Sequence, residues 1–212
     1  MYRPPSFLTA LVLLLLSVPM SASGQTLRQR WGVTFDVSPT WTMPDYQAVL
    51  LNAERVDMSG SEFRVGLTRG RVLGGDWSLS FVRKSIRDRD EAVVKSDGTV
   101  LGTNANTLLA AELSGFKSLA TIKRRVQIGV TVGAGVGRFR GTVVQSRPGS
   151  PQEMVAAETL FSFQRGPAEV VPLGRAELTG AITVAARTKV RLSGGVGFPG
   201  QRVIGIGLTQ FF

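Results

Sequence analysis

The 212-residue sequence contains no cysteine and no histidine, and these two absences exclude several kinds of chemistry. Without thiolates or imidazoles, a zinc, haem or iron–sulfur site lacks its usual ligands, so no metal and no cofactor are expected. Hydrolysis by a serine–histidine–aspartate triad is excluded because its general base is absent. The lack of cysteine also fits an exported bacterial protein that does not rely on disulfides.

Long apolar runs are scarce as well, and the longest lies at the amino end. Phe7 to Val18 is apolar, Arg3 precedes this run, and small residues follow it at Ser21–Gly24. The layout predicts a secretory signal peptide over 1–24, because the run is shorter than the ~20 residues that a membrane-spanning helix needs. No later stretch could span as a helix, so the mature chain, 25–212, is either a soluble exported protein or a membrane barrel.

The formal charge is +10, but the basic residues are not gathered into one run or one helix. Nucleic-acid-binding proteins concentrate their basic residues in a patch, so no nucleic-acid partner is expected. Glycine is abundant, with 25 residues, and aromatic residues make up 8% of the chain. This composition fits many short strands and turns better than helices.

Apolar and polar residues alternate with period two in several stretches, which is the pattern of strands with one apolar face. Trp31–Val37 and Val126–Val136 show it most cleanly. Pro39 is expected to end the first of these strands, because proline has no backbone N–H to donate to a ladder. The pattern predicts eight strands, at residues 30–38, 61–71, 76–87, 108–120, 126–143, 171–186, 190–198 and 201–212.

The connections after odd-numbered strands are mostly long and those after even-numbered strands are short, and the first long one changes to a helical period. Apolar residues recur there at helical spacing from Tyr46 to Val56, and Thr42 is suited to be the N-cap. A short amphipathic helix is therefore predicted at 42–57, as a plug, a lid or an element packed on the rim. Residues 87–106 are predicted to form an exposed loop with a frayed hairpin, and residues 145–170 a second long loop.

The last twelve residues, Gln201–Phe212, hold the most specific pattern in the chain. One face of this strand carries large apolar side chains, and the other face is small or polar. The large apolar residues are Ile204, Ile206, Leu208 and Phe212. This ending resembles the C-terminal strand of bacterial outer-membrane β-barrels, which closes on an aromatic residue. The resemblance implies that these four residues form the signal for the barrel-assembly machinery.

Over the whole mature chain, the pattern is similar to that of the small single-domain outer-membrane proteins with eight strands. This resemblance implies an all-β fold, an eight-stranded antiparallel up-and-down transmembrane β-barrel. It also implies a monomer that is surrounded by outer-membrane lipid and has both termini in the periplasm. An even number of strands closes the ring without an edge, and long connections alternating with short ones fit outer loops and periplasmic turns.

The direction of the alternation decides which residues face the interior. The face opposite the apolar rows is rich in glycine, serine and threonine and carries isolated charges of both signs, which suits a narrow barrel lumen. We expect these charges to pair in a salt-bridge network, because an unpaired ion there would cost several kcal/mol; a polar line that guides a solute is the alternative. The residues are Asp36, Glu62, Arg64, Glu112, Arg175, Glu177 and Arg191.

Two further groups of residues bear on placement in a membrane. Trp31, Trp77 and Phe212 lie at strand ends, where an interfacial aromatic girdle would be. Arg138 and Arg140 lie at the outer end of the fifth strand on the lipid-facing side, at the height where lipopolysaccharide phosphates would sit. A lipopolysaccharide contact and a solvated loop base are both open for these two arginines.

The sequence therefore predicts an outer-membrane barrel with a structural or surface-interaction role. The outer-membrane barrel enzymes resemble one another in depending on a catalytic histidine, which is absent here, so no enzymatic activity is expected. A narrow channel for small or apolar solutes is the alternative. A soluble periplasmic β-sandwich binding module is the second alternative, because period-two alternation alone does not tell an outward apolar face from an inward one.

Overall fold

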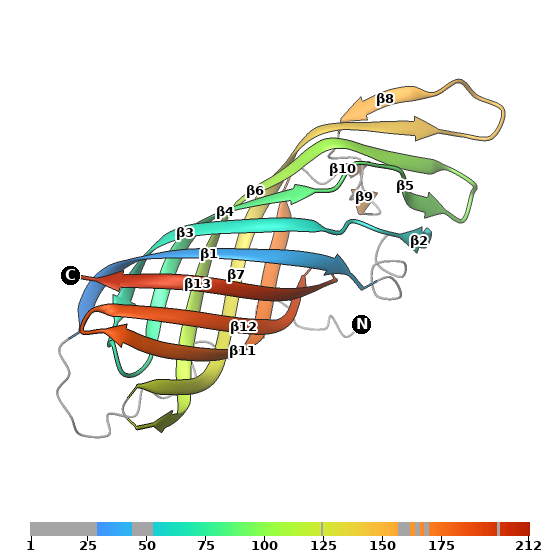
Figure 1. The fold of residues 1–212 in the computed structure, drawn as a ribbon. Coiled ribbons are helices and arrows are strands. Elements are labelled where there is room, and N and C mark those ends of the chain that lie inside the picture. The colour runs from blue at the N-terminus through green and yellow to red at the C-terminus, as the bar shows by residue number, and fades with distance from the viewer. Residues whose placement is uncertain are drawn as a thin grey trace, which may run out of the picture.

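The computed structural model describes residues 29–43, 53–123, 125–156, 162–163, 166–167, 170–198 and 200–212. Within these residues, eight strands pair antiparallel in one ring that closes where the last strand meets the first (Figure 1). The all-β barrel that the alternation predicts is therefore confirmed. In ring order the strands are β1 (Arg30–Thr42), β3 (Gly60–Gly70), β4 (Asp76–Ile86), β6 (Val100–Ile122), β7 (Val126–Ser146), β11 (Val171–Ala185), β12 (Thr188–Phe198) and β13 (Gln201–Phe211).

Short strands extend the sheet beyond one end of the ring (Figure 1). β5 (Arg89–Lys95) pairs with β6 and with β2 (Ala53–Val56), and β8 (Glu153–Ala156) pairs with β7. β9 (Ser162–Phe163) and β10 (Gly166–Pro167) form a separate two-stranded sheet. We call β2, β5, β8 and the parts of β6 and β7 paired with them the loop-end sheet, and this end of the barrel the loop end. The opposite end, where β1 begins and β13 ends, is the terminal end.

The eight predicted strands agree with the ring strands, with differences at their ends. β1 continues through Pro39 to Thr42, so the prediction that Pro39 ends it is wrong. Pro39 is paired with Ser61 of β3, whereas pairing with β13 stops after Val37 and resumes at Thr40. A proline is tolerated in a strand where one side has no ladder bond to lose, and this interruption supplies such a place.

The helix predicted at 42–57 is contradicted at both ends of that segment. Thr42, the expected N-cap, belongs to β1 and pairs with β13, and Ala53–Val56 form β2. The hydroxyl of Thr42 accepts a 2.6 Å hydrogen bond from the Met58 amide, which fixes the returning chain against the barrel. Residues 44–52 lie outside the described residues, so a helix there stays a prediction. In the part of the chain that the structure describes, there is no helix long and apolar enough to cross a membrane.

The connections that are predicted as exposed loops contain paired strands. Residues 87–106 include the β5–β6 hairpin, whose side chains Val93 and Leu101 are buried in one cluster with Val143 of β7. The predicted exposure is therefore wrong there, because these side chains remove one another's apolar surface from water. The segment 145–170 likewise begins with the end of β7 and contains β8, and much of the rest of it lies outside the described residues.

The strands are staggered around the ring, and this stagger sets the width of the interior. From Leu208, paired residues lead through β1, β3, β4, β6 and β7 to Pro172 of β11. In the other direction they lead through β12 to Ile182 of the same strand, ten residues away from Pro172. A stagger of ten in an eight-stranded ring corresponds to a strand tilt of about 40°, and side chains nearly fill the interior of such a barrel.

Side chains of the ring alternate between a buried interior face and an exposed outer face, and the outer face is apolar. Soluble monomers rarely expose apolar patches larger than a few hundred Å², so this distribution is the reverse of a water-soluble fold. The β-sandwich alternative is therefore wrong, because one closed barrel carries its charges inside and its apolar rows outside. The outward rows include Phe35, Val37, Phe63, Leu67, Leu79, Phe81, Leu113, Ile128, Val136, Leu178, Ile182, Leu192, Ile204, Ile206 and Leu208.

Candidate functional site

The interior at mid-height contains charged side chains that we call the central cluster: Asp36, Glu62, Arg64, Glu112, Arg175 and Glu177. Arg175 Nε lies 2.8 Å from Glu112 Oε1, and Arg175 Nη1 lies 3.1 Å from Glu177 Oε2. Arg64 pairs with Glu62 on its own strand, and its Nε lies 3.8 Å from Glu112 Oε2. Arg64 Nη1 also lies 4.0 Å from Glu177 Oε1, on the strand opposite β3 in the ring. The central cluster therefore links walls of the barrel across the lumen.

Two glycines leave the space that this cluster occupies. A Cβ at Gly133 would lie 2.9 Å from Glu112 Oε1 and 3.0 Å from Arg175 Nε. A Cβ at Gly207 would overlap the carboxylate of Asp36. Asp36 itself interacts with the surrounding arginines at longer range. Glycine on the interior face thus makes room for long charged side chains from other strands.

A second group of charges, Asp76, Lys189 and Arg191, lies at the terminal end, and we call it the end cluster. Asp76 Oδ2 accepts hydrogen bonds from Arg191 Nη2 at 2.6 Å and from Lys189 Nζ at 3.2 Å. Asp76 belongs to β4 and both cations belong to β12, the strand opposite β4 in the ring. Lys189 is fully buried and also donates to the carbonyl oxygen of Arg71 at 3.3 Å. These bonds span the barrel close to its terminal mouth.

Two phenylalanine rings enclose the Lys189 ammonium. Its Nζ lies 5.4 Å from the ring centroid of Phe116 and 5.7 Å from that of Phe211. The Arg191 guanidinium lies 5.6 Å from the Phe116 centroid. Cation–π contacts of this kind are worth about 2 kcal/mol when they are desolvated. Phe211 therefore points into the barrel, while its neighbour Phe212 is 64% exposed on the outer face.

Hydroxyl groups occupy the interior between the two clusters on one side of the barrel. Thr34 Oγ1 lies 2.5 Å from Thr68 Oγ1 and 2.9 Å from Thr209 Oγ1. Thr68 Oγ1 lies 2.7 Å from Ser78 Oγ, so the chain of hydrogen bonds crosses β13, β1, β3 and β4. All four hydroxyls are on buried residues, and each therefore has a partner in place of water.

Toward the loop end the interior becomes more apolar. Met58, just after β2, is buried there, and Gln201 Nε2 donates to its carbonyl oxygen at 3.3 Å. The polar, small-residue interior that the sequence predicts is therefore only part of this half of the barrel, where Ser38, Thr40, Lys84 and Gln201 are buried. Packed apolar side chains occupy much of the rest: Val56, Met58, Val82, Ile86, Val93, Leu101, Leu108, Ala110, Phe139, Val143, Val171 and Leu173. We call this set the apolar cluster.

The structure places all seven predicted lumen residues on the interior face. Six lie in the central cluster, and the seventh, Arg191, lies in the end cluster. Among the described residues, Asp76, Lys84 and Lys189 are also charged and buried, and the predicted set lacks them. Asp76 and Lys189 adjoin turns, where a polar residue is expected without any role in the interior. The alternation would have found them, because Asp76 is in phase with Ser78 and Lys189 with Arg191.

The residues predicted to contact lipid or to direct assembly lie on the outer face. Arg138 and Arg140 are exposed near the loop end of β7, and the four apolar residues of the terminal strand are 42% to 64% exposed. At the terminal end, the rings of Trp31 and Trp77 meet edge to face with centroids 5.8 Å apart. Trp41 is exposed at the loop end of β1. At a tilt of about 40°, the stretch from Trp31 to Trp41 spans about 25 Å, the height of the apolar band of a membrane barrel.

The inward-facing charges of the described strands are balanced in sign. Paired charges of opposite sign have little need of mobile counter-ions, and removing one partner costs more than the pair contributes. The arrangement therefore suits bracing opposite walls of a narrow barrel, and the apolar cluster occupies much of the interior toward the loop end. The acidic residues are Asp36, Glu62, Asp76, Glu112 and Glu177, and the basic residues are Arg64, Lys84, Arg175, Lys189 and Arg191.

No protein-family model and no curated protein matches the chain. Among solved structures, the chain is similar to Neisserial surface protein A, with 10% identity, a TM-score of 0.49, and coverage of 86% of this chain and 97% of that one. It is also similar to the attachment invasion locus protein Ail of Yersinia pestis, with 10% identity, a TM-score of 0.47, and coverage of 87% and 99%. A third is the N-terminal β-barrel domain of Pseudomonas aeruginosa OprF, with 10% identity, a TM-score of 0.40, and coverage of 87% and 100%.

At these levels of identity and TM-score, the likenesses carry no inference about activity. The architecture is established by the strand pairing itself, because the ring closes through the β13–β1 and β6–β7 pairs. The alternation adds an apolar outside and an ion-paired inside. The chain is a small eight-stranded antiparallel β-barrel.

Proposed function

We propose that the chain is a bacterial outer-membrane β-barrel, exported with cleavage of residues 1–24 and inserted with both termini in the periplasm. The apolar outer face between Trp31 and Trp41 supports this placement, because its large side chains are favourable in lipid and unfavourable in water. The loop end then faces the cell exterior, since the longer connections lie there and the connections at the terminal end are all short.

The role that we propose is structural or surface-interacting, with a lumen that does not conduct. The observation that carries it is the bridging of opposite walls, by Asp76 with Lys189 and Arg191 and by Arg64 with Glu177. These bridges obstruct the lumen at two heights, and the apolar cluster occupies much of the half beyond them. Water or an ion that entered the apolar cluster would lose hydrogen bonds without compensation.

The loop-end sheet is the part of the molecule that a partner outside the cell would meet. Its side chains Val93, Leu101 and Val143 are buried, so it is a folded extension of the barrel. Its rim carries exposed charges of both signs, such as Arg87 and Glu91. A preformed surface loses little conformational freedom on binding, which favours recognition of a polar partner by this sheet.

The outer face has three further proposed partners: membrane lipid, the assembly machinery and lipopolysaccharide. The assembly machinery would read the apolar row of β13 before the strand pairs, at Ile204, Ile206, Leu208 and Phe212. Lipopolysaccharide phosphates would meet Arg138 and Arg140 near the loop end of β7, because arginine binds phosphate with two parallel hydrogen bonds. A closed ring presents no unpaired strand edge within the bilayer, which is consistent with a monomer.

Planar-bilayer recording tests the closed lumen. The intact protein is expected to show no steady openings. Arg64→Ala should stay silent because the end cluster and the apolar cluster remain. A variant lacking residues 43–57 should also stay silent, since Leu108 and Phe139 still fill the interior. A large-pore porin reconstituted in the same way is the positive control.

Steady large-conductance openings of the intact protein would overturn the closed lumen and make a channel for small solutes the better proposal. Openings confined to the variant lacking residues 43–57 would indicate a pore that this segment gates.

A further inference from the structure

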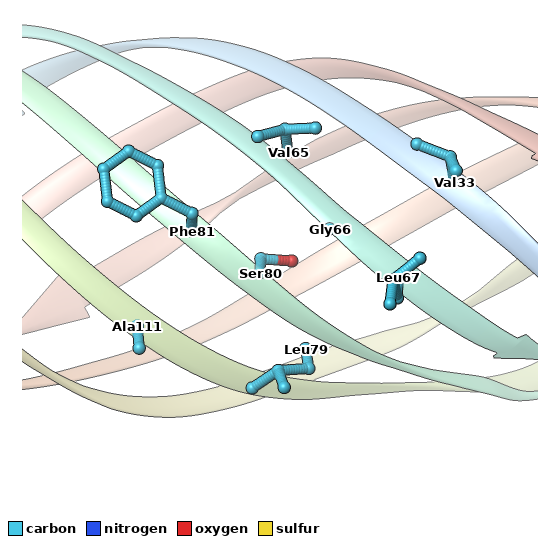
Figure 2. A pocket seen from close by; sticks show the side chains of 8 residues that line it. All are labelled: Val33, Val65, Gly66, Leu67, Leu79, Ser80, Phe81 and Ala111. Carbon is cyan, nitrogen blue, oxygen red and sulfur yellow. The ribbon is translucent and has the colours of Figure 1, made fainter.

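The outer face of the barrel is hollowed within its apolar belt, by which we mean the outward apolar rows between the heights of Trp31 and Trp41 (Figure 2). Leu67, Leu79 and Phe81 stand out around the hollow and are 50% to 55% exposed. Its floor is low because Ala111 has only a methyl group, and because Gly66 and Ser80, whose side-chain positions face the interior, line it with their backbone. The full lining is Val33, Val65, Gly66, Leu67, Leu79, Ser80, Phe81 and Ala111, from β1, β3, β4 and β6. We call it the outer groove.

On the loop-end side of the outer groove the apolar belt ends, and exposed arginines take the next outward positions. On β4 the outward row continues from Leu79 and Phe81 to Arg83, which is exposed. Arg83 is paired with Leu109 of β6, and Leu109 is paired with Arg138 of β7. The two arginines therefore flank one leucine on the same outer face. Their Cα atoms are two strand spacings apart, about 10 Å, which is close enough for both guanidinium groups to reach one phosphate.

The groove and the arginines together fit a ligand with two chemically different parts. An acyl chain covers an apolar groove, and a phosphate accepts charge-assisted hydrogen bonds from two guanidinium groups. A second copy of the chain fits less well, because a twofold contact through this face would bring Arg83 and Arg138 of both copies together. A free phosphate would leave the groove uncovered.

We propose that this face binds one phosphorylated, acylated lipid of the outer leaflet, with an acyl chain in the outer groove and a phosphate between Arg83 and Arg138. The site rests on the proposed placement of the barrel in the outer membrane. It specifies which face of the barrel holds the lipid, and it adds Arg83 and the groove to the contact.

Native mass spectrometry of the full mature protein tests the phosphate half, with lipid A extracted from outer membranes as the probe. The double variant Arg83→Gln/Arg138→Gln should lower the affinity for lipid A by roughly tenfold or more, because two charge-assisted contacts are lost. The matched control is Arg202→Gln. Arg202 is also an exposed outward arginine near the loop end, but it lies on β13, opposite β6 in the ring. Its replacement should leave the affinity unchanged.

Filling the groove tests the acyl half. Ala111→Trp should weaken binding of intact lipid A and leave binding of the deacylated headgroup as it is in the parent protein. Ala176→Trp, at an exposed outward alanine of β11, is the matched control and should change neither. Equal lipid binding by the Arg83→Gln/Arg138→Gln and Arg202→Gln proteins would overturn the site, and so would a dimer cross-linked through position 111.

Migration of the unboiled protein on a gel separates failure of this site from failure of the barrel assignment. All of these variants should keep the migration of a folded barrel, because each substitution is on the outer face. Loss of lipid binding together with loss of that migration would overturn the reading of Arg83 and Arg138 as ligand contacts. Loss of binding with migration intact supports it.

Discussion

At the residue scale, Asp76 is the position where one carboxylate holds two cations of the opposite wall. Asp76→Asn would leave Lys189 and Arg191 buried without their counter-charge, and breaking a buried pair in this way costs ~3–5 kcal/mol. We expect a lower urea midpoint of unfolding, followed by tryptophan fluorescence in lipid vesicles. Asp97→Asn, in the exposed turn between β5 and β6, is the control and should have little effect. Equal midpoints for both variants would contradict a bracing role for the end cluster.

The outward residues of β11 predict a cost of charge that depends on depth in the bilayer. Leu178 and Val184 are 63% and 59% exposed, but Leu178 lies near the middle of the belt and Val184 at the terminal end. Leu178→Arg should lower the free energy of unfolding by ~2–4 kcal/mol and Val184→Arg by ~0–1 kcal/mol. Denaturant titration in vesicles measures both values. If Val184→Arg were the more costly change, the middle of the apolar belt would not lie near Leu178.

The interior residues differ in how far the sequence could predict them. Asp36 and Glu62 follow from alternation alone, because each belongs to a clean strand pattern. Asp76 and Lys189 stand beside turns, where a polar residue has a local explanation that does not require burial. The contact between Arg64 and Glu177 could not be predicted, since it depends on which strands become opposite after the ring closes. Pairing across the lumen is a property of closure.

At the element scale, β13 ends in two phenylalanines that face opposite ways. Phe211→Ala should lower the free energy of unfolding by ~3–5 kcal/mol, because it leaves a cavity and removes one ring from the Lys189 ammonium. Phe212→Ala should instead lower the amount of assembled protein in the membrane fraction, with a smaller change in the stability of what assembles. Each variant is the control for the other. The same loss of yield and stability in both would contradict separate roles.

The strands of the ring could be predicted well, and the elements at the loop end could not. Ring strands repeat one pattern over many residues, whereas Pro39 and Thr42 carry local signals for a strand end and a helix start. Pairing with neighbouring strands outweighs both signals, since β1 is hydrogen-bonded to β3 through Pro39 and to β13 again from Thr40. In the β5–β6 hairpin, burial of Val93 depends on Val56 and Val143, which are distant in sequence.

At the scale of the whole molecule, the closed ring predicts resistance to detergent. Unboiled protein in sodium dodecyl sulfate should migrate faster than boiled protein, because opening the barrel requires breaking a complete ladder between two strands. A variant lacking residues 201–212 has no strand to close the ring, and it should migrate identically before and after boiling. A single unchanged band for the intact protein would contradict the closed barrel.

Whether the apolar rows face outward or inward is the part of the architecture that needed the three-dimensional structure. A period of two gives the same apolar rows for a sandwich and for a barrel, and only the closure between β6 and β7 and between β13 and β1 decides between them. The apolar filling of the loop end was available from the same pattern, because Val82, Leu108 and Phe139 are in phase with inward residues of their strands.

The unequal heights of the barrel wall have a mechanical consequence. β6 has 23 residues and β7 has 21, against 11 in β12 and β13, so two adjacent strands run from the barrel wall into the loop-end sheet. A pull on that sheet acts along these strands and stretches many of their hydrogen bonds at the same time, whereas a pull across an edge breaks them one after another. A partner that held the β5–β6 and β7–β8 hairpins would therefore load β6 and β7 in shear, and the tall side of the barrel would carry most of that load.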